Sequence, residues 1–513
     1  MDLPNNFKLL DCSLRDGGYY TNWDFDQNLI KSYQSNIKKL PFDYIEIGYR
    51  NILQKEYRGS YFYTPIGILE KWSSLDKKIV LMIDEICTPL AKVEDLISPC
   101  KGLAVMFRIA AKPHRIKEAI EMAKIIKKNG FTVCLNLMYV SEWNNNKYVF
   151  SNLKGIEEIV DYLYMADSYG SFLPDQIEKT IHEIRSYTTV KLGFHGHNNL
   201  EMGLINALKA IENGVELIDS SITGMGRGAG NLKSELILTY LDSLKLRSVN
   251  FDSLNSLVSK FDAIKNQYNW GNNLAYMVSG ANSIAQKEVM DLINKRFYTI
   301  DNAIKYLGFR NSSVTVKKFP KLNSSNNKDI LVIGGGLSVI DHLDSIKLFI
   351  KQNPKISILF SSARFMKYFH EFKGFNILVG AEGKRLEKNI LKNSFSNTCI
   401  IPPNPHKIEP YVPKNVFKFC VQLSNTIFAP ENCDSHLAIT LQACVELGGK
   451  KLHLVGFDGY STLNAEKKEV FFMLENQTIL DYFKIKKPNI KIISLTPTAY
   501  KKIEVVSLYS LIK

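Results

Sequence analysis

Short apolar runs alternate with amphipathic stretches throughout the first half of the chain. Several of the runs are almost continuously apolar, as is typical of strands in a parallel sheet. We predict eight strands, at residues 8–14, 44–49, 78–84, 103–110, 132–140, 161–167, 191–197 and 216–224. Between them, segments such as 114–130 carry apolar residues at intervals of three and four, which predicts helices. Eight strand–helix units over about 240 residues match the length and order of a (β/α)8 barrel.

A doubly wound open sheet is the alternative arrangement for this alternation. We favour the barrel because the eight successive units contain no glycine-rich dinucleotide-binding turn. The pattern of residues 251–307 is mostly helical, which predicts an extension that packs across the barrel or forms an oligomer contact. Residues 311–329 are polar and rich in turn-forming residues, which predicts a linker.

The alternation of strands and helices starts again at Ile330. The predicted strands of this second half begin at Ile330 and continue at residues 355–362, 375–381, 397–402 and 450–458. The predicted fold class is therefore α/β, with an N-terminal TIM barrel, a helical extension and a second, Rossmann-like α/β domain. The predicted boundaries are 1–250 for the barrel, 251–310 for the extension, 311–328 for the linker and 329–513 for the second domain.

Length and composition agree with two soluble domains. The 513 residues are too many for one ordinary core, and 45% hydrophobic with 23% charged residues is typical of globular proteins. The N-terminus does not have the pattern of a signal peptide, and no apolar run approaches the roughly 20 residues of a membrane helix. Eight cysteines are scattered without a CxxC pair, which indicates reduced core thiols. We therefore expect a cytoplasmic protein without membrane contact.

The net charge of +14 raises the question of whether the protein binds nucleic acid or small anionic molecules. Lysines are spread along the chain and no arginine–aromatic motif recurs, so we expect no nucleic-acid partner. A basic surface is compatible with small phosphorylated or carboxylated substrates.

Polar side chains stand where the predicted barrel strands end. They are Arg15 and Asp16 after 8–14, Glu46 in 44–49, "ADSYG" at 166–170, "FHGHNN" at 194–199 and "TGMGRGAGNLKSE" at 223–235. The carboxyl ends of barrel strands meet at one mouth, and closure places the last two strands beside the first. His195 and His197 alternate along a strand and so face the same side. With Asp16 they form a donor set that suits a catalytic divalent ion.

The loop "GMGRGAGN" combines structural glycines with Arg227 and Asn231. Its backbone amides are candidates for holding an anionic substrate group, and Asn231 for a fourth metal ligand. A flexible loop that happens to be rich in glycine is the other interpretation.

Five motifs occur in an order known from one superfamily. They are "DCSLRDGGY", "IEIGYR", "ADSYG", "FHGHNN" and "GMGRGAGN". Over about residues 7–307 the chain resembles the DRE-TIM metallolyases, which are similar to HMG-CoA lyase. It looks closest to the 4-hydroxy-2-oxovalerate aldolases. The resemblance implies an aldolase that joins or splits pyruvate, or a related 2-oxo acid, and an aldehyde.

The resemblance also assigns roles to particular residues. It implies metal ligation by Asp16, His195 and His197 with Asn231 as a possible fourth ligand, stabilisation of the enolate oxygen by Arg15, orientation of Arg15 by Glu46, and substrate contacts from Gly17, Ser168, Gly226 and Gly228. The implied ion is Mn²⁺ or Mg²⁺, with Co²⁺ or Zn²⁺ as alternatives. A metal and a guanidinium together neutralise the charge of an enolate, which is what breaking a bond β to a carbonyl requires.

One position departs from the family pattern. The 4-hydroxy-2-oxovalerate aldolases place a histidine four residues after the arginine, and this chain has Tyr19 there. Tyrosine is a poor base at neutral pH unless its pKa is lowered. The base is therefore Tyr19, Tyr20 or a metal-bound water, or the acceptor differs.

Other enzyme classes stay open or are disfavoured. The biotin-linked carboxyltransferases of the superfamily use a barrel lysine, and residues 132–140 contain none. Two alternative functions remain open: an acyl-CoA-dependent Claisen-type synthase, and a nucleotide-dependent transferase whose barrel is only a scaffold. The sequence also leaves open whether the chain forms a homo-oligomer.

The second domain begins with "DILVIGGGLSVIDHL" at residues 329–343. This pattern predicts a strand, a glycine-rich turn and a helix that Ser338 caps, and such a turn can hold a phosphate. The last glycine of the GxGxxG fingerprint is missing, since Val339 stands there, and a tight strand-to-helix turn is the other interpretation.

Together with the later "LVGFDG", this turn is similar to α/β domains related to archaeal pterin diphosphokinases and bacterial flagellin glycosyltransferases. The resemblance covers about residues 329–460 and implies binding of a nucleotide or sugar-nucleotide phosphate. The candidate residues are Gly334, Gly335, Gly336, Ser338 and Asp458, with His436 as a further polar candidate. For His436 and Asp458 we favour a capping or core role.

Overall fold

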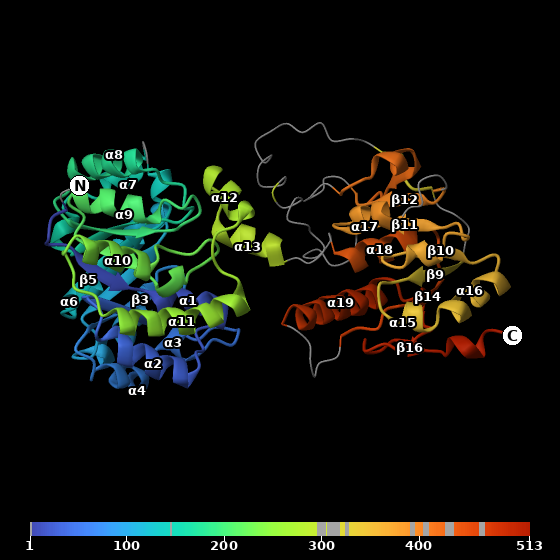
Figure 1. The fold of residues 1–513 in the computed structure, drawn as a ribbon, viewed down its shortest axis with the longest axis horizontal. Coiled ribbons are helices and arrows are strands. Elements are labelled where there is room, and N and C mark those ends of the chain that lie inside the picture. Colours follow the sequence, from blue (N-terminus) through green and yellow to red (C-terminus); the bar gives the residue numbers. More distant parts are fainter. Residues whose placement is uncertain are drawn as a thin grey trace. The chain divides into compact units, whose positions relative to one another are not determined.

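The protein is described from a computed structural model (Figure 1). The structure describes residues 3–143, 146–294, 304, 319–323, 328–389, 395–403, 410–425, 435–460 and 467–513. The chain forms two compact units, Met1–Met290 and Asp291–Lys513. Most of the predicted linker, residues 311–328, lies outside the described part. Within the described residues, no helix is both long and apolar enough to cross a membrane.

Eight parallel strands close into a barrel in the first unit. They are β1 (Lys8–Asp11), β2 (Tyr44–Tyr49), β3 (Lys78–Asp84), β4 (Met106–Ala111), β5 (Thr132–Leu137), β6 (Tyr162–Asp167), β7 (Lys191–Gly196) and β8 (Leu217–Ser220). The barrel closes where β8 pairs with β1; there Lys8 lies opposite Leu217 and Asp11 opposite Ser220. The prediction of a TIM barrel is therefore confirmed.

Amphipathic helices surround this barrel (Figure 1). They are α1 (Ser13–Thr21), α2 (Gln27–Ile37), α3 (Ser60–Tyr63), α4 (Ile66–Leu69), α5 (Leu90–Ile97), α6 (Ile116–Lys128), α7 (Lys147–Ser151), α8 (Pro174–Arg185), α9 (Gly203–Glu212) and α10 (Ser234–Ser243). Helix α6 shows how the pattern acts, since Ala119, Met122 and Ile126 are buried at spacings of three and four.

The first strand is shorter than its apolar run predicted. The expected strand over 8–14 ends at Asp11, and Arg15 and Asp16 lie in the first turns of α1. The Asp11 carboxylate accepts hydrogen bonds from the Ser13 amide and hydroxyl, both at 3.0 Å. This local bond turns the chain directly from strand to helix, which is a common effect of a short polar side chain.

In the described part of the chain up to residue 294, three helices follow the barrel: α11 (Phe251–Tyr268), α12 (Leu274–Ala281) and α13 (Gln286–Asn294). Helix α11 packs against α2. Helix α12 is attached to the loop after β7, because the Asn199 side chain donates to the Tyr276 carbonyl (3.0 Å) and to the Ser279 hydroxyl (3.1 Å). The extension thus supports a loop at the carboxyl ends of the barrel strands.

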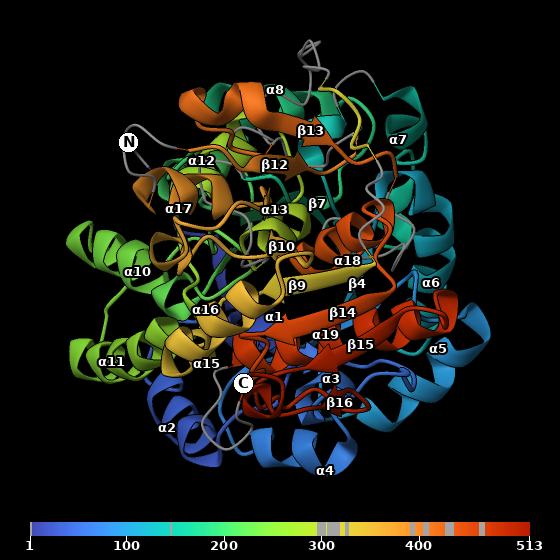
Figure 2. The same ribbon diagram turned by 90° about the vertical axis from the view of Figure 1, so that its right-hand side faces the viewer.

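The second unit is built on an eight-stranded parallel sheet. Its strands are β9 (Asp329–Ile333), β10 (Ser357–Phe360), β11 (Phe375–Ile377), β12 (Thr398–Ile401), β13 (Cys420–Gln422), β14 (Lys451–Val455), β15 (Lys491–Ser494) and β16 (Glu504–Val505). The spatial order is β13-β12-β11-β10-β9-β14-β15-β16. The order reverses between β9 and β14, which lie side by side in Figure 2. The sequence did not predict β13, β15 or β16.

Helices cover both faces of this sheet. The described ones are α15 (Ser338–Asp341), α16 (Leu343–Gln352), α17 (Glu382–Asn389), α18 (His436–Glu446) and α19 (Lys467–Lys486). Alternate residues of β9 face two separate cores: Ile330 packs with residues of α18 and α19, and Leu331 packs with residues of α16. This double-sided arrangement confirms the predicted Rossmann-like α/β class.

Candidate functional sites in the two units

Arg15 and Asp16 meet in the barrel mouth with Glu46 from β2. The Arg15 Nε donates to Glu46 Oε2 at 2.7 Å, and its guanidinium also pairs with the Asp16 carboxylate. All three side chains are buried. Burial alone raises the pKa of Asp16, but Arg15 and His195 outweigh it and hold that pKa well below its usual value. Asp16 is therefore an anion facing the site.

His195, on β7, is held by a second carboxylate. Its Nδ1 lies 2.8 Å from Asp219 Oδ2 on β8, and its Nε2 lies 3.5 Å from Asp16 Oδ2. Burial raises the pKa of Asp219, but Arg108 and His195 lower it below its usual value, so Nδ1 donates to a carboxylate. A carboxylate behind an imidazole fixes the ring and leaves the other nitrogen for a metal.

His197 and Asn231 lie beside His195 with unused polar atoms. The two imidazole rings are 5.2 Å apart between centroids. Within the described chain, His197 Nδ1 and Asn231 Oδ1 are buried without a hydrogen-bond partner. The Asn231 amide donates to Asp16 Oδ2 at 2.7 Å. Burial, then His195, lowers the pKa of His197 to about 3, so its imidazole is neutral, the form that ligates metals.

Cys12 is a neighbour of this group that sequence reasoning missed. The ligating atoms of Cys12, Asp16 and His195 all lie within 4.8 Å of one another, a spacing that allows one ion to reach all three. The predicted ligand His197 is adjacent to this group and not within it. Unpartnered nitrogen and oxygen atoms beside a buried carboxylate fit a divalent cation.

A buried guanidinium connects the two halves of the site. Arg108, on β4, donates to Glu46 Oε2 (3.0 Å), Asp219 Oδ2 (2.6 Å) and Asn136 Oδ1 (3.1 Å). Tyr164 also donates to Asp219, at 2.8 Å. Glu46 orients Arg15 and Asp219 orients His195, so Arg108 positions both. The signal for it in the sequence was a single arginine inside the apolar run "VMFRIA".

Tyr19 stands on α1 at the edge of this site. Its hydroxyl is 3.0 Å from the Tyr49 hydroxyl, and the Arg227 guanidinium lies 4.3 Å from the centre of its ring. Arg227 Nε is buried and has no hydrogen-bond partner in the described chain. Tyr20 differs, because burial raises its pKa far above the usual value and its hydroxyl accepts from the Gly228 amide at 3.0 Å.

The predicted substrate-contacting glycines have structural constraints. A Cβ at Gly17 would lie 2.4 Å from Met225 Sδ, and one at Gly226 would lie 2.6 Å from the Asn231 side chain. These glycines let the loop after β8 approach α1 and Asn231. The Gly228 amide, predicted to face an anion, donates to the Tyr20 hydroxyl instead. Ser168, after β6, accepts from the Tyr139 amide at 3.0 Å.

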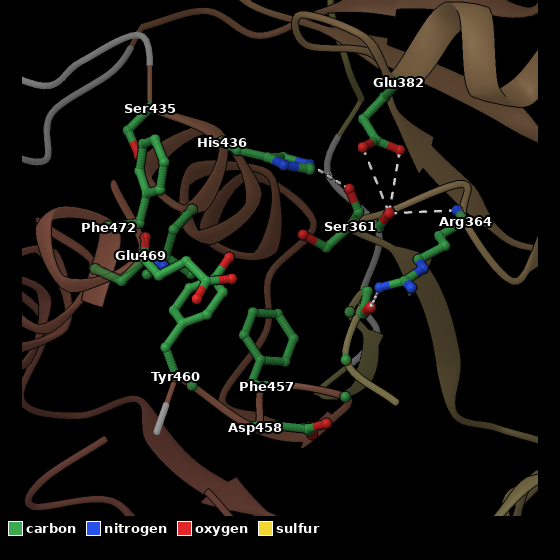
Figure 3. A pocket seen from close by; sticks show the side chains of 18 of the residues that line it. Ser361, Arg364, Glu382, Ser435, His436, Phe457, Asp458, Tyr460, Glu469 and Phe472 are labelled. Carbon is green, nitrogen blue, oxygen red and sulfur yellow. Dashed lines mark hydrogen bonds between the residues drawn. The ribbon is translucent and has the colours of Figure 1, made fainter. Parts of the chain in front are cut away.

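The glycine-rich turn of the second unit lies at the reversal point of its sheet. The amides of Gly334 and Gly336 donate to the carbonyls of Val455 (2.8 Å) and Gly456 (2.9 Å). Ser338, predicted to cap the helix, lies inside α15, and Asp458 is the cap: its carboxylate accepts from the Ser338 amide at 3.0 Å and from the Ser338 hydroxyl. A pocket of about 700 Å³ opens beside this turn (Figure 3).

Known proteins match the barrel half. The sequence profile of the HMGL-like family matches residues 103–259. The N-terminal domain of a proposed aldolase from Bacteroides vulgatus is 47% identical and covers 57% of this chain and 98% of that domain, with a TM-score of 0.55. A 4-hydroxy-2-oxovalerate aldolase from Bacillus cereus is 27% identical over 46% of this chain and 70% of its own length. An oxaloacetate decarboxylase from Mycobacterium tuberculosis is 26% identical over 45% of this chain and 69% of its own length.

These matches agree with the motif order and with the closed barrel. A relative of 47% identity is covered over almost its whole length, and the family profile matches within the same unit. The chain therefore belongs to the HMGL-like family of the DRE-TIM metallolyase superfamily and is an enzyme of this metal-dependent lyase class.

Proposed function

We propose that the barrel is a divalent-metal-dependent aldolase that makes or cleaves a carbon–carbon bond between pyruvate, or a similar 2-oxo acid, and an aldehyde. The observation that carries the proposal is the convergence of Asp16 and His195 beside two atoms that are buried and unpartnered within the described chain, His197 Nδ1 and Asn231 Oδ1. The Arg15–Glu46 ion pair lies next to this group. The similarity to 4-hydroxy-2-oxovalerate aldolases supports it.

Asp16, His195 and His197 would hold the ion, with Asn231 as a fourth ligand and Cys12 Sγ within reach. When bound, Mn²⁺ or Mg²⁺ supplies a Lewis acid for the keto oxygen of the substrate. Asp219 keeps the Nδ1 proton of His195 in place, so that Nε2 would be the nitrogen that holds the ion.

Arg15 stabilises the charge that forms during cleavage. In the cleavage direction a base takes the proton of the substrate hydroxyl, the carbon–carbon bond breaks, and the aldehyde leaves. The bonding electron pair moves into an enolate of the 2-oxo acid, whose oxygen becomes negative. The Arg15 guanidinium, fixed by Glu46, donates to that oxygen without reorganising.

Tyr19 is the proposed proton carrier. Its hydroxyl lies 3.0 Å from the Tyr49 hydroxyl, and the Arg227 guanidinium lies over its ring beside the candidate metal ligands. Tyr20 is not a suitable base, because burial raises its pKa and its hydroxyl is engaged by Gly228. We assign Arg227 Nε to the substrate carboxylate, since this donor is buried and unpartnered within the described chain.

Hydrogen exchange at the methyl group of pyruvate tests the proposal. We expect the protein with Mg²⁺ to exchange pyruvate methyl protons in D2O, followed by NMR, and to lose this activity with EDTA or in Asp16→Ala. The control His182→Ala, an exposed histidine on α8, retains it. Absence of exchange with every divalent ion would contradict the proposal. Thiol release from acetyl-CoA would instead favour the Claisen-type synthase.

A second candidate reaction uses the same enolate. Similarity to an oxaloacetate decarboxylase, together with Tyr19 at the position of the aldolase histidine, favours decarboxylation of a 2-oxo diacid as the alternative. Loss of CO2 leaves the pyruvate enolate directly and needs no base for a substrate hydroxyl. Metal-dependent CO2 release from oxaloacetate that is faster than any aldol cleavage would favour this reaction.

For the second unit, we propose binding of a nucleotide- or phosphate-linked substrate, such as an activated sugar. Its support is the pocket at the carboxyl ends of β9 and β14, where the strand order reverses. In open parallel sheets this is the usual place of ligands. Calorimetric titration of the full chain with nucleotides tests it.

A further inference from the structure

From residue 329 to the last residue of the sequence, arginine occurs only at the pocket. Residues 329–513 contain 22 lysines but only two arginines, Arg364 and Arg385. Both line the pocket. Arginine presents a planar fork of donors that matches phosphate or carboxylate oxygens, whereas lysine serves general surface charge. The restriction of arginine to one cavity indicates an anionic ligand group there.

A backbone carbonyl and a buried carboxylate hold the two guanidinium groups in position. Arg364, just after β10, donates to the Gly335 carbonyl at 2.9 Å. Arg385, on α17, pairs with Glu382, which is buried and also accepts from the Ala363 amide at 2.6 Å. A guanidinium has five N–H donors, so each arginine can keep these contacts and still bind an anion.

The wall across the cavity is aromatic and acidic. In Figure 3, Tyr460, Glu469 and Phe472 lie on the opposite side of the pocket from Arg364 and Glu382. Carboxylates repel a phosphate and accept hydrogen bonds from hydroxyl groups, and aromatic rings stack on planar ones. The pocket therefore has one end for an anion and one end for a ring with hydroxyls.

The glycine-rich turn is less suited to hold an anion than the two arginines. Three of its amides, those of Gly334, Gly336 and Ser338, already donate to Val455, Gly456 and Asp458. The Asp458 carboxylate adds negative charge at the start of α15. A phosphate placed there would have to displace the Val455, Gly456 and Asp458 oxygens from these amides, and the Asp458 carboxylate would repel it.

We propose that the pocket binds a nucleoside diphosphate group with its phosphates on Arg364 and Arg385 and its base against Tyr460 and Phe472, not on the glycine-rich turn. This inference rests on the proposed function of the second unit and assigns the parts of its ligand. The volume of about 700 Å³ suits a ligand of this size. Arg385 is held by Glu382, so Glu382 is a positioning residue for the phosphate.

Calorimetric titration of the full chain tests this arrangement. The probes are ADP, CDP, GDP and UDP, inorganic pyrophosphate, the matching nucleosides, and UDP-glucose as a sugar-linked diphosphate. We expect at least one nucleoside diphosphate to bind. Arg364→Ala and Arg385→Ala each weaken that binding and pyrophosphate binding by about tenfold or more. Phe472→Ala weakens the nucleotide and leaves pyrophosphate unchanged.

Matched controls separate the possible failures. Lys355→Ala removes an exposed positive charge outside the pocket and is expected to change neither affinity. Nucleotide binding that is unaffected by both arginine variants would overturn this inference and leave the proposed function standing. No binding of any nucleotide or of pyrophosphate would overturn both. Tighter binding of UDP-glucose than of UDP would identify the sugar nucleotide as the ligand.

Discussion

At the residue scale, the candidate active site depends on side chains that touch no substrate. Arg108 joins Glu46 and Asp219, and these two carboxylates orient Arg15 and His195. All of them are buried. A buried charge without its partner is costly, so the network holds its geometry only when it is complete.

Replacing Arg108 tests this network. We expect Arg108→Leu to destabilise the barrel unit by about 3–5 kcal/mol, because it leaves Glu46 and Asp219 buried without their counter-charge. Urea unfolding followed by tryptophan fluorescence measures the effect, since all four tryptophans lie in residues 1–290. Lys124→Met removes a half-exposed ion pair and is expected to leave the curve unchanged. Equal stability of both variants would refute the interpretation.

Asp219 gives a second test at this scale. Asp219→Asn keeps the shape of the side chain but removes the charge behind His195. We expect Mn²⁺ to bind about 10–100-fold more weakly, measured as free Mn²⁺ by electron paramagnetic resonance. Asp95→Asn changes an exposed carboxylate on α5 and serves as the control. An unchanged affinity in Asp219→Asn would show that His195 is oriented by other contacts.

At the element scale, the loop after β8 is fixed between α1 and the helical extension. Gly228 adopts a φ of +62°, and a Cβ there would lie 2.0 Å from Gln286 Oε1. Its amide holds Tyr20 of α1. The helical extension therefore helps to position the loop that carries Arg227 and Asn231. Through this contact the extension belongs to the same functional unit as the barrel.

Substituting Gly228 tests the position of this loop. We expect Gly228→Ala to lower both the melting temperature and the rate of pyruvate exchange, since left-handed backbone and a collision with Gln286 oppose the methyl group. Gly67→Ala, in α4 with open space around it, is the matched control and should be neutral or slightly stabilising. A fully active Gly228→Ala would mean that the loop tolerates displacement.

At the scale of the whole molecule, each unit has its own core. The first unit contains one large cluster and a smaller one built mainly from residues of the barrel strands, and two clusters lie on the faces of the sheet in the second. We expect a fragment of residues 1–294 to fold and to exchange pyruvate protons at the rate of the full chain. The solved domain from Bacteroides vulgatus, 98% of which this chain covers, supports independent folding. An inactive but folded fragment would show that the barrel needs the second unit.

The sequence by itself determined the elements that depend on local periodicity and motif order. Eight apolar runs and five ordered motifs were enough to predict the barrel and its family, because strand spacing and barrel closure leave few alternatives. In the second unit β13, β15 and β16 were missed. For β13 and β16 the reason is that strands of three and two residues carry too little pattern.

Tertiary structure alone decided the contacts made across the barrel and across the sheet. Cys12 and Asp219 gained their place beside His195 only when β1, β7 and β8 became neighbours. Asp458 is 120 residues from Ser338 in sequence, yet it caps α15 because β9 pairs with β14. That pairing engages amides of the predicted phosphate-binding turn, which is why we propose Arg364 and Arg385 as the anion site. A motif fixes which donors are available, but distant partners determine which of them remain free for a ligand.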